Sequence, residues 1–202
     1  MIRALFLLVG SLVLCYVTGI LLTTPLVLAG GPKSEAARND ELRQQVEQIL
    51  SQDATQKLQS LGPSAIPHLV ALYKDGKYRK EILPVLTQSK QPEGRRAIEE
   101  ALLAETSNDE IYLMAQALGT INQQDSKPVL IKKLRRFSKS EPSLGGITFG
   151  GSSDMAHLGL IWALARLEGH QFGSAENHVW RGEDAMKCLE WWRKNRARFG
   201  IK

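Results

Sequence analysis

The chain has 202 residues, of which 43% are hydrophobic and 23% are charged, and its net charge is +5. These values are ordinary for a globular protein and exclude a wholly disordered chain, while the positive charge permits an acidic partner without requiring one. The two cysteines, Cys15 and Cys188, show no zinc-binding spacing. Because Cys15 falls in a hydrophobic leader, we expect no intramolecular disulfide, and we expect Cys188 to pack between helices.

The leader opens the chain. Residues 4–22 are almost continuously apolar, follow the single positive charge of Arg3, and precede a helix-breaking Thr-Thr-Pro run. This pattern is typical of a secretory signal peptide over residues 1–29, cleaved after Ala29. The apolar run is also long enough to span a bilayer, so an uncleaved N-terminal anchor is the alternative. Either way we expect an exported domain, periplasmic or extracellular, which a retained segment 4–22 would tether to the cytoplasmic membrane.

After a linker at residues 30–34, apolar residues recur at helical spacing along the chain. Gly62 and Pro63 punctuate this pattern, and Ser107 with Glu110 forms a capping box that predicts a helix start at residue 108. No stretch alternates apolar and polar residues with a period of two, so we expect no β-sheet. The predicted helices cover residues 35–52, 54–61, 64–74, 78–87, 92–104, 108–121, 126–136, 154–167 and 183–196.

Part of this pattern repeats at a step of 32 residues. Each copy consists of two short helices, and the apolar face of the first copy begins at Tyr78. Neither helix can bury its apolar stripe alone, so neighbouring copies must stack. The sequence therefore predicts an all-α fold, a short α-solenoid of helical pairs over residues 35–202. The residues that superpose are Leu86 and Leu118, Ile98 and Leu130, and Leu102 and Leu134.

Three stretches resemble HEAT repeats. Residues 61–69 (Leu-Gly-Pro-Ser-Ala-Ile-Pro-His-Leu) are similar to the opening of such a repeat, and residues 117–121 with 128–130 resemble the bacterial HEAT-like subtype that also occurs in phycobilisome lyases. Residues 163–173, followed by the pair Trp191-Trp192, resemble the end of secreted bacterial HEAT-repeat proteins. The resemblance implies a HEAT-like domain that binds other proteins. No residue matches a chromophore-lyase active site, so no lyase activity is implied.

A Gly/Ser-rich loop at residues 138–153 interrupts the repeat, because Leu118 and Leu164 are 46 residues apart instead of 32. An insertion of this length in a stacked array lies on one rim and is often functional. Its Gly-Gly pairs lack the lysine and the preceding strand of a phosphate-binding loop. A solvated loop that caps the next helix is one interpretation, and a partner-binding loop is another. The apolar residues that favour partner binding are Leu144, Ile147 and Phe149.

One group of side chains has metal-ligand chemistry, namely Asp154, His157, His170, His178 and Glu183. Asp154 and His157 share a helix face, but the spacing of the group matches no zinc signature. We therefore expect surface or turn-packing histidines, with no metal, no cofactor and no catalytic residue. A hydrolytic or metal-dependent enzyme that uses His157, His170 and His178 is the alternative.

The last 41 residues hold all four tryptophans: Trp162, Trp180, Trp191 and Trp192. Large aromatic residues are expected to seal the last repeat, which has no further neighbour. An exposed aromatic pair that serves as an interface hot spot is the alternative. Adjacent helical residues point about 100° apart, so we expect either Trp191 or Trp192 to lie at a groove edge.

Two basic clusters complete the pattern. Cations at a solvated helix end offset the helix macrodipole, which is the simplest interpretation of both clusters. An anionic membrane surface is an alternative target, whereas nucleic acid is not expected, because no nucleic-acid motif accompanies the first cluster. The first cluster is Lys132, Lys133, Arg135, Arg136 and Lys139, and the second is Arg193, Lys194, Arg196 and Arg198.

Together these patterns predict a non-enzymatic scaffold, exported or membrane-tethered, that mediates protein–protein interaction. The alternatives are the metal-dependent or hydrolytic enzyme and an adaptor that binds anionic membrane surfaces through the basic helix ends. The candidate partner-binding residues are Leu144, Ile147, Phe149, Trp180, Trp191 and Trp192.

Overall fold

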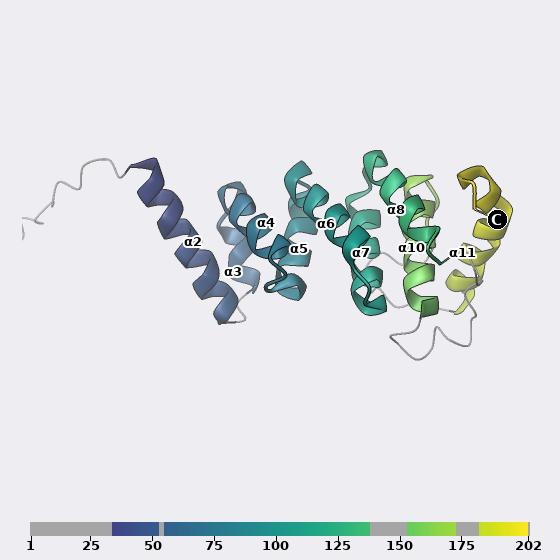
Figure 1. Ribbon diagram of the computed structural model, residues 1–202, viewed down its shortest axis with the longest axis horizontal. Coiled ribbons are helices and arrows are strands. Elements are labelled where there is room, and N and C mark those ends of the chain that lie inside the picture. The colour runs from purple at the N-terminus through teal and green to yellow at the C-terminus, as the bar shows by residue number, and fades with distance from the viewer. Residues whose placement is uncertain (1–33, 53–54, 138–152, 173–181, 202) are drawn as a thin grey trace, which may run out of the picture. The chain divides into compact units, whose positions relative to one another are not determined.

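A computed structural model describes residues 34–52, 55–137, 153–172 and 182–201, and every regular element in these ranges is a helix (Figure 1). The all-α prediction is confirmed there, and the described ranges contain no strand. None of their helices is long and apolar enough to cross a membrane. The predicted leader at residues 1–29 and most of the loop at 138–153 lie outside the described residues.

The chain divides into two compact units, Met1–Glu41 and Leu42–Lys202, and the second unit holds every helix from α3 onward. The α-helices of the described ranges are α2 (Glu35–Ser51), α3 (Thr55–Ser60), α4 (Ile66–Lys74), α5 (Arg79–Ser89), α6 (Pro92–Ala104), α7 (Asn108–Ile121), α8 (Lys127–Leu134), α10 (Ser153–Leu167) and α11 (Gly182–Asn195). The 3-10 helices there are η1 (Pro63–Ala65), η2 (Gln124–Ser126) and η3 (Arg196–Phe199).

These bounds match the predicted ranges to within about three residues, and the deviations have local causes. Tyr78 adopts a left-handed backbone conformation at φ 52°, so α5 begins one residue later than predicted. Tyr78 is also 40% exposed, and its predicted place on the apolar face is wrong. Ser153 begins α10 and does not belong to the preceding loop.

A common turn geometry joins the helices in pairs. Helices α3, α5, α7 and α10 are each followed within two residues by a residue with positive φ, at Gly62, Lys90, Asn122 and Gly169. This left-handed conformation ends a helix, and glycine and asparagine adopt it at the least steric cost. The helices that follow the first three turns, α4, α6 and α8, each carry a proline in the first turn. There the missing N–H breaks no helical hydrogen bond.

The helices of the second unit pack in two rows, and successive helices alternate between the rows. Figure 1 shows these helices following one another in chain order. Helices α3, α5, α7 and α10 contact one another in succession, as do α4, α6 and α8. Contacts between the rows join α4 to α5, α5 to α6 and α6 to α7, while α8 and α11 both pack on α10. One continuous hydrophobic core results, and it extends from Val46 to Ile201.

The residues predicted to repeat at a step of 32 form the centre of this core. All of them are fully buried, which confirms the core stripes derived from the sequence. They are Leu86, Ile98, Leu102, Leu118, Leu130 and Leu134.

The most extensive helix contact joins α7 to α10, and two glycines permit it. A Cβ atom on Gly119 would lie 2.7 Å from the Trp162 ring and 2.9 Å from the Cα atom of Ala163. A Cβ atom on Gly159 would lie 2.7 Å from the Tyr112 ring. All three distances are shorter than carbon atoms tolerate, so the two helix backbones approach as closely as they do because side chains are absent at these positions.

We predict that Gly119→Ala destabilises the fold by about 1–3 kcal/mol, because the added methyl group would force the α7 and α10 backbones apart. Chemical denaturation followed by circular dichroism measures this change. Gly182→Ala is the matched control, since a Cβ atom there meets no atom within 4 Å. Equal stabilities of the two variants would contradict the close-packing interpretation.

Candidate functional site

Two of the six predicted partner-binding residues lie in the described ranges, and both are buried. Trp191 is 7% exposed and Trp192 is 2% exposed. The Phe199 ring of η3 lies 6.2 Å from each of their rings, while His170 contacts Trp191 and His157 contacts Trp192. The prediction that one of the two tryptophans lies at a groove edge is therefore wrong. Phe199 of η3 packs against both tryptophans of α11, which agrees with the expected sealing role of these aromatic residues and not with the alternative of an exposed pair.

The other four predicted residues, Leu144, Ile147, Phe149 and Trp180, lie outside the described residues, and their role stays a prediction.

The described histidines near the C-terminus take part in packing. His157 is 4% exposed and lies between the rings of Phe137 and Trp192, while His170 stacks on Phe172. His178 lies outside the described residues. Within the described ranges, no group of three or more His, Cys, Asp or Glu side chains is arranged to hold a metal ion.

Cys188 also has a packing role, as predicted. Its side chain is completely buried in α11, and this burial raises the pKa of the thiol well above its ordinary value. A thiol in such surroundings stays protonated and is a poor nucleophile.

A partly buried polar network surrounds Glu105, at the junction between α6 and α7. The Glu105 carboxylate accepts the backbone N–H groups of Thr106 and Ser107 at 2.8 and 2.9 Å and an Arg79 guanidinium N–H at 3.0 Å. Hydrogen bonds from these N–H groups, that of Ser107 foremost, hold the pKa of Glu105 below its ordinary value. Ser107 precedes α7, but its side chain makes no capping hydrogen bond, so the predicted capping box does not form.

Part of the first basic cluster belongs to this network. Lys133 is only 2% exposed, which corrects its prediction as a solvated residue, and burial lowers its pKa. Its ammonium group donates a hydrogen bond to the backbone carbonyl of Glu105, and Arg136 donates to that of Leu103 at 2.8 Å. These two cations therefore neutralise the carbonyl end of α6, the neighbouring helix.

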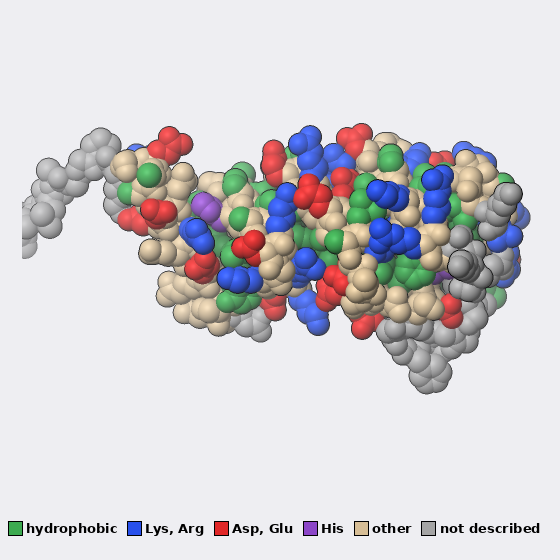
Figure 2. Space-filling model, in the orientation of Figure 1, with side chains coloured by type: hydrophobic (Ala, Val, Ile, Leu, Met, Phe, Trp, Pro, Cys, Tyr) green, Lys and Arg blue, Asp and Glu red, His purple; other side chains and the backbone are tan. Residues whose placement is uncertain are grey.

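The remaining residues of α8 present a basic groove to solvent. Figure 2 shows lysine and arginine side chains gathered over α8. At one end of the groove Lys127 pairs with Glu168 at 2.5 Å, and at the other Arg135 donates to the carbonyl of Phe199 at 3.4 Å. Lys132 is exposed between them. We call this surface the α8 groove; its volume is about 760 Å³, and its lining is Gln124, Lys127, Pro128, Ile131, Lys132 and Arg135.

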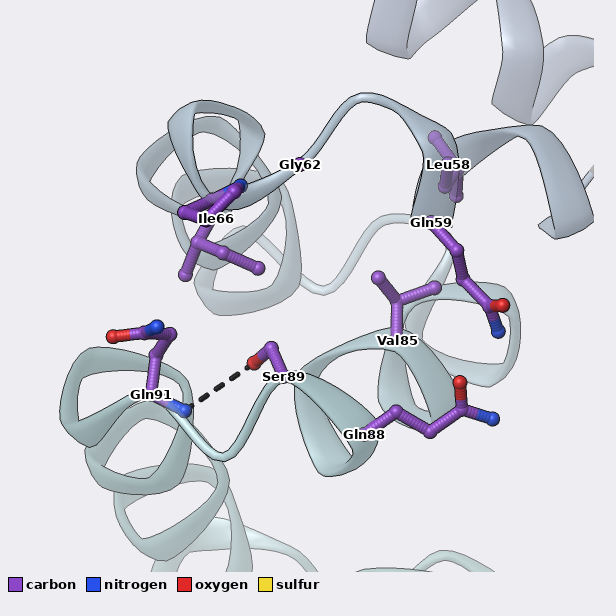
Figure 3. A pocket seen from close by; sticks show the side chains of 9 residues that line it. Leu58, Gln59, Gly62, Ile66, Val85, Gln88, Ser89 and Gln91 are labelled. Carbon is purple, nitrogen blue, oxygen red and sulfur yellow. Dashed lines mark hydrogen bonds between the residues drawn. The ribbon is translucent and has the colours of Figure 1, made fainter.

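A second hollow lies between α3, η1, α4 and α5 and has a different character (Figure 3). Figure 3 shows Gln59 and Gln88 on one side of it and Gln91 on the other. Its volume is about 240 Å³, and no charged residue lines it. Sequence reasoning missed this amide-rimmed pocket, because its residues come from several elements and share no spacing. The lining residues are Leu58, Gln59, Gly62, Pro63, Ile66, Val85, Gln88, Ser89 and Gln91.

The charge of the described residues changes sign along the chain. In the described ranges, residues 34–126 hold ten Lys or Arg against thirteen Asp or Glu and are therefore net negative. Residues 127–201 hold eleven Lys or Arg against five Asp or Glu and are therefore net positive. The α8 groove therefore lies in the positive part of the domain, and the amide-rimmed pocket in the negative part.

No protein-family model, curated protein or solved structure gives a significant match to this chain. The chemistry of the two surfaces is therefore the basis for inferring a function.

We predict that Glu105→Gln reduces the acid sensitivity of the fold. Because the native pKa of Glu105 is lowered, its ionisation stabilises the protein above its ordinary pKa, and this contribution is lost as the pH falls toward the native pKa. The decrease in melting temperature between about pH 6 and about pH 3.5 should therefore be smaller in the variant than in the original protein.

Glu100→Gln is the control, because the Glu100 side chain is 63% exposed and pairs with Lys74 at the surface. An acid response of Glu105→Gln equal to that of the original protein would show that the network around Glu105 does not depend on its charge.

Proposed function

We propose that this chain is a non-enzymatic scaffold with a HEAT-like α-solenoid, and that it binds another protein. The observation that carries the proposal is the packing of alternate helices in two rows, α3–α5–α7–α10 and α4–α6–α8. In a stacked array each helical pair contacts only its neighbours. The repeated left-handed turns and the helix-starting prolines support the same assignment, because they give successive pairs the same local construction.

A binding role fits the chemistry of the described residues better than catalysis does. The two side chains in the C-terminal region with the greatest catalytic potential, His157 and Cys188, are buried among hydrophobic residues. Repeat arrays of this type use extended surfaces for binding. The two surfaces described above, the α8 groove and the amide-rimmed pocket, both have the size of peptide side chains or short segments.

The proposal includes the location inferred from the leader. A signal peptide at residues 1–29, or an anchor at 4–22, would place the domain outside the cytoplasmic membrane, in the periplasm or beyond the cell. Partner binding is assigned to the C-terminal part of the domain, where the loop at 138–152 adjoins α8 and α10 in sequence.

We predict that deleting residues 144–151 abolishes capture of the partner without unfolding the domain. The experiment uses chemical cross-linking of the full chain in envelope fractions, followed by mass spectrometry, with thermal melting as the folding control. Lost stability with retained capture would mean that the loop seals the domain and does not bind. Absence of any stoichiometric cross-linked protein would contradict the scaffold proposal itself.

A membrane-surface adaptor is the second candidate, and the positive charge of residues 127–201 is the observation that favours it. Cosedimentation with vesicles that contain anionic phospholipid tests it. Binding that weakens strongly between about 0.05 and 0.5 M salt is expected of such an adaptor, because each exposed cation contributes about 1 kcal/mol near an anionic surface at low salt.

A further inference from the structure

We propose that the α8 groove binds an extended acidic segment of a partner protein, in which one apolar residue lies between two carboxylates. The inference rests on the proposed scaffold function and names the chemistry of its partner. It is drawn from three observations: the spacing of charged and apolar residues along α8, the contacts that hold two of the cations, and the charge of the surrounding residues.

The spacing of residues on α8 matches an extended peptide. Lys127 and Arg135 are eight residues apart, which is about 12 Å along a helix axis, and Ile131 lies midway between them. In an extended chain, residues i, i+2 and i+4 point to the same side and span about 13 Å. A segment of the form carboxylate–any–apolar–any–carboxylate therefore aligns its acids with the two cations and its apolar side chain with Ile131.

Two of the cations are held in place before any partner binds. The Lys127 ammonium is 2.5 Å from the Glu168 carboxylate, and the Arg135 guanidinium donates to the carbonyl of Phe199. A guanidinium has five N–H donors and an ammonium has three, so both groups can bind more than one acceptor at a time. Because their positions are already restricted, less side-chain entropy is lost when a carboxylate binds them.

Lys132 supplies additional positive charge between the two held cations. It is exposed, and it forms no ion pair with the part of the chain that the structure describes. Glu168, which contacts the groove through Lys127, also pairs with Arg198 at 3.4 Å, and Asp125, between the lining residues Gln124 and Lys127, pairs with Arg95 at 3.3 Å. The groove therefore keeps a net positive charge, and an acidic segment complements it.

The apolar floor favours a protein over other anions. Pro128 and Ile131 separate the cations and are partly accessible, so they offer an apolar contact that a free phosphate or a sugar–phosphate backbone does not use. No aromatic side chain is among the lining residues, whereas sites for single-stranded nucleic acid stack bases on aromatic rings. The neutral amide-rimmed pocket offers no charge to select such a segment.

The test is a fluorescence-anisotropy titration of the full chain, in a neutral detergent, with a labelled peptide that contains Glu-Ser-Leu-Ser-Glu. We expect saturable binding that Lys132→Glu together with Arg135→Glu weakens about tenfold or more, because both substitutions place repulsive charges in the groove. Replacement of both peptide glutamates by glutamine should weaken binding similarly. Lys77→Glu together with Lys80→Glu, which make the same total charge change on two exposed residues away from the groove, are the matched control and should alter the affinity less than about twofold.

Equal binding of the glutamine peptide, or unchanged affinity of the double variant, overturns the proposal. Binding of anionic phosphatidylglycerol vesicles, without binding of the peptide, also overturns it and assigns the groove to a membrane surface. Concentration-dependent self-association that the double variant abolishes would assign the groove to a second copy of the chain instead. If the double variant still captures the envelope partner in the cross-linking experiment, the acidic-segment proposal is wrong and the scaffold function is unaffected. If the unaltered chain captures no protein at all, the scaffold function itself is contradicted.

Discussion

The close approach of α7 and α10 is the constraint on which the rest of the domain depends. Gly119 and Gly159 bring the two backbones to a distance at which a methyl group would collide with the facing helix. Arg166 reinforces this contact, since its side chain donates to the Gly119 carbonyl at 3.2 Å and lies over the Trp162 ring. Because α8 and α11 both pack on α10, the position of α10 also determines where the α8 groove and the aromatic C-terminal end lie.

Electrostatics distinguish the partly buried acidic side chains of the domain from its basic surface. Acidic side chains such as Glu105 and Glu168 are largely buried and paired, and their hydrogen bonds join segments far apart in sequence. Glu99 belongs to the same class, because it accepts hydrogen bonds from Arg95 and Ser126 at 2.6 Å each. The described residues from 127 to 201 also hold more cations than anions, eleven Lys or Arg against five Asp or Glu, and an acidic partner would complement this excess.

Local signals in the sequence were sufficient for the helices and the core stripes, but not for contacts between distant segments. Proline and glycine marked most helix boundaries, and the 32-residue step identified core residues such as Leu118, which are fully buried. The first basic cluster was predicted to be solvated because the hydrogen-bond partner of Lys133, the Glu105 carbonyl, lies 28 residues earlier in the sequence and gives no local signal. Adjacent residues such as Trp191 and Trp192 do point in different directions on a helix, but no local sequence signal indicated that Phe199 would pack against both of them. The amide-rimmed pocket was missed for the same reason.

Native-state hydrogen exchange at low denaturant concentration tests the central role of the α7–α10 contact most directly. If this contact supports the whole array, amides in both helices open with one common free energy, higher than that of α3 or α11. An opening free energy of α10 that is lower than that of α7 by more than about 1 kcal/mol would contradict the account, because the two helices would then unfold independently.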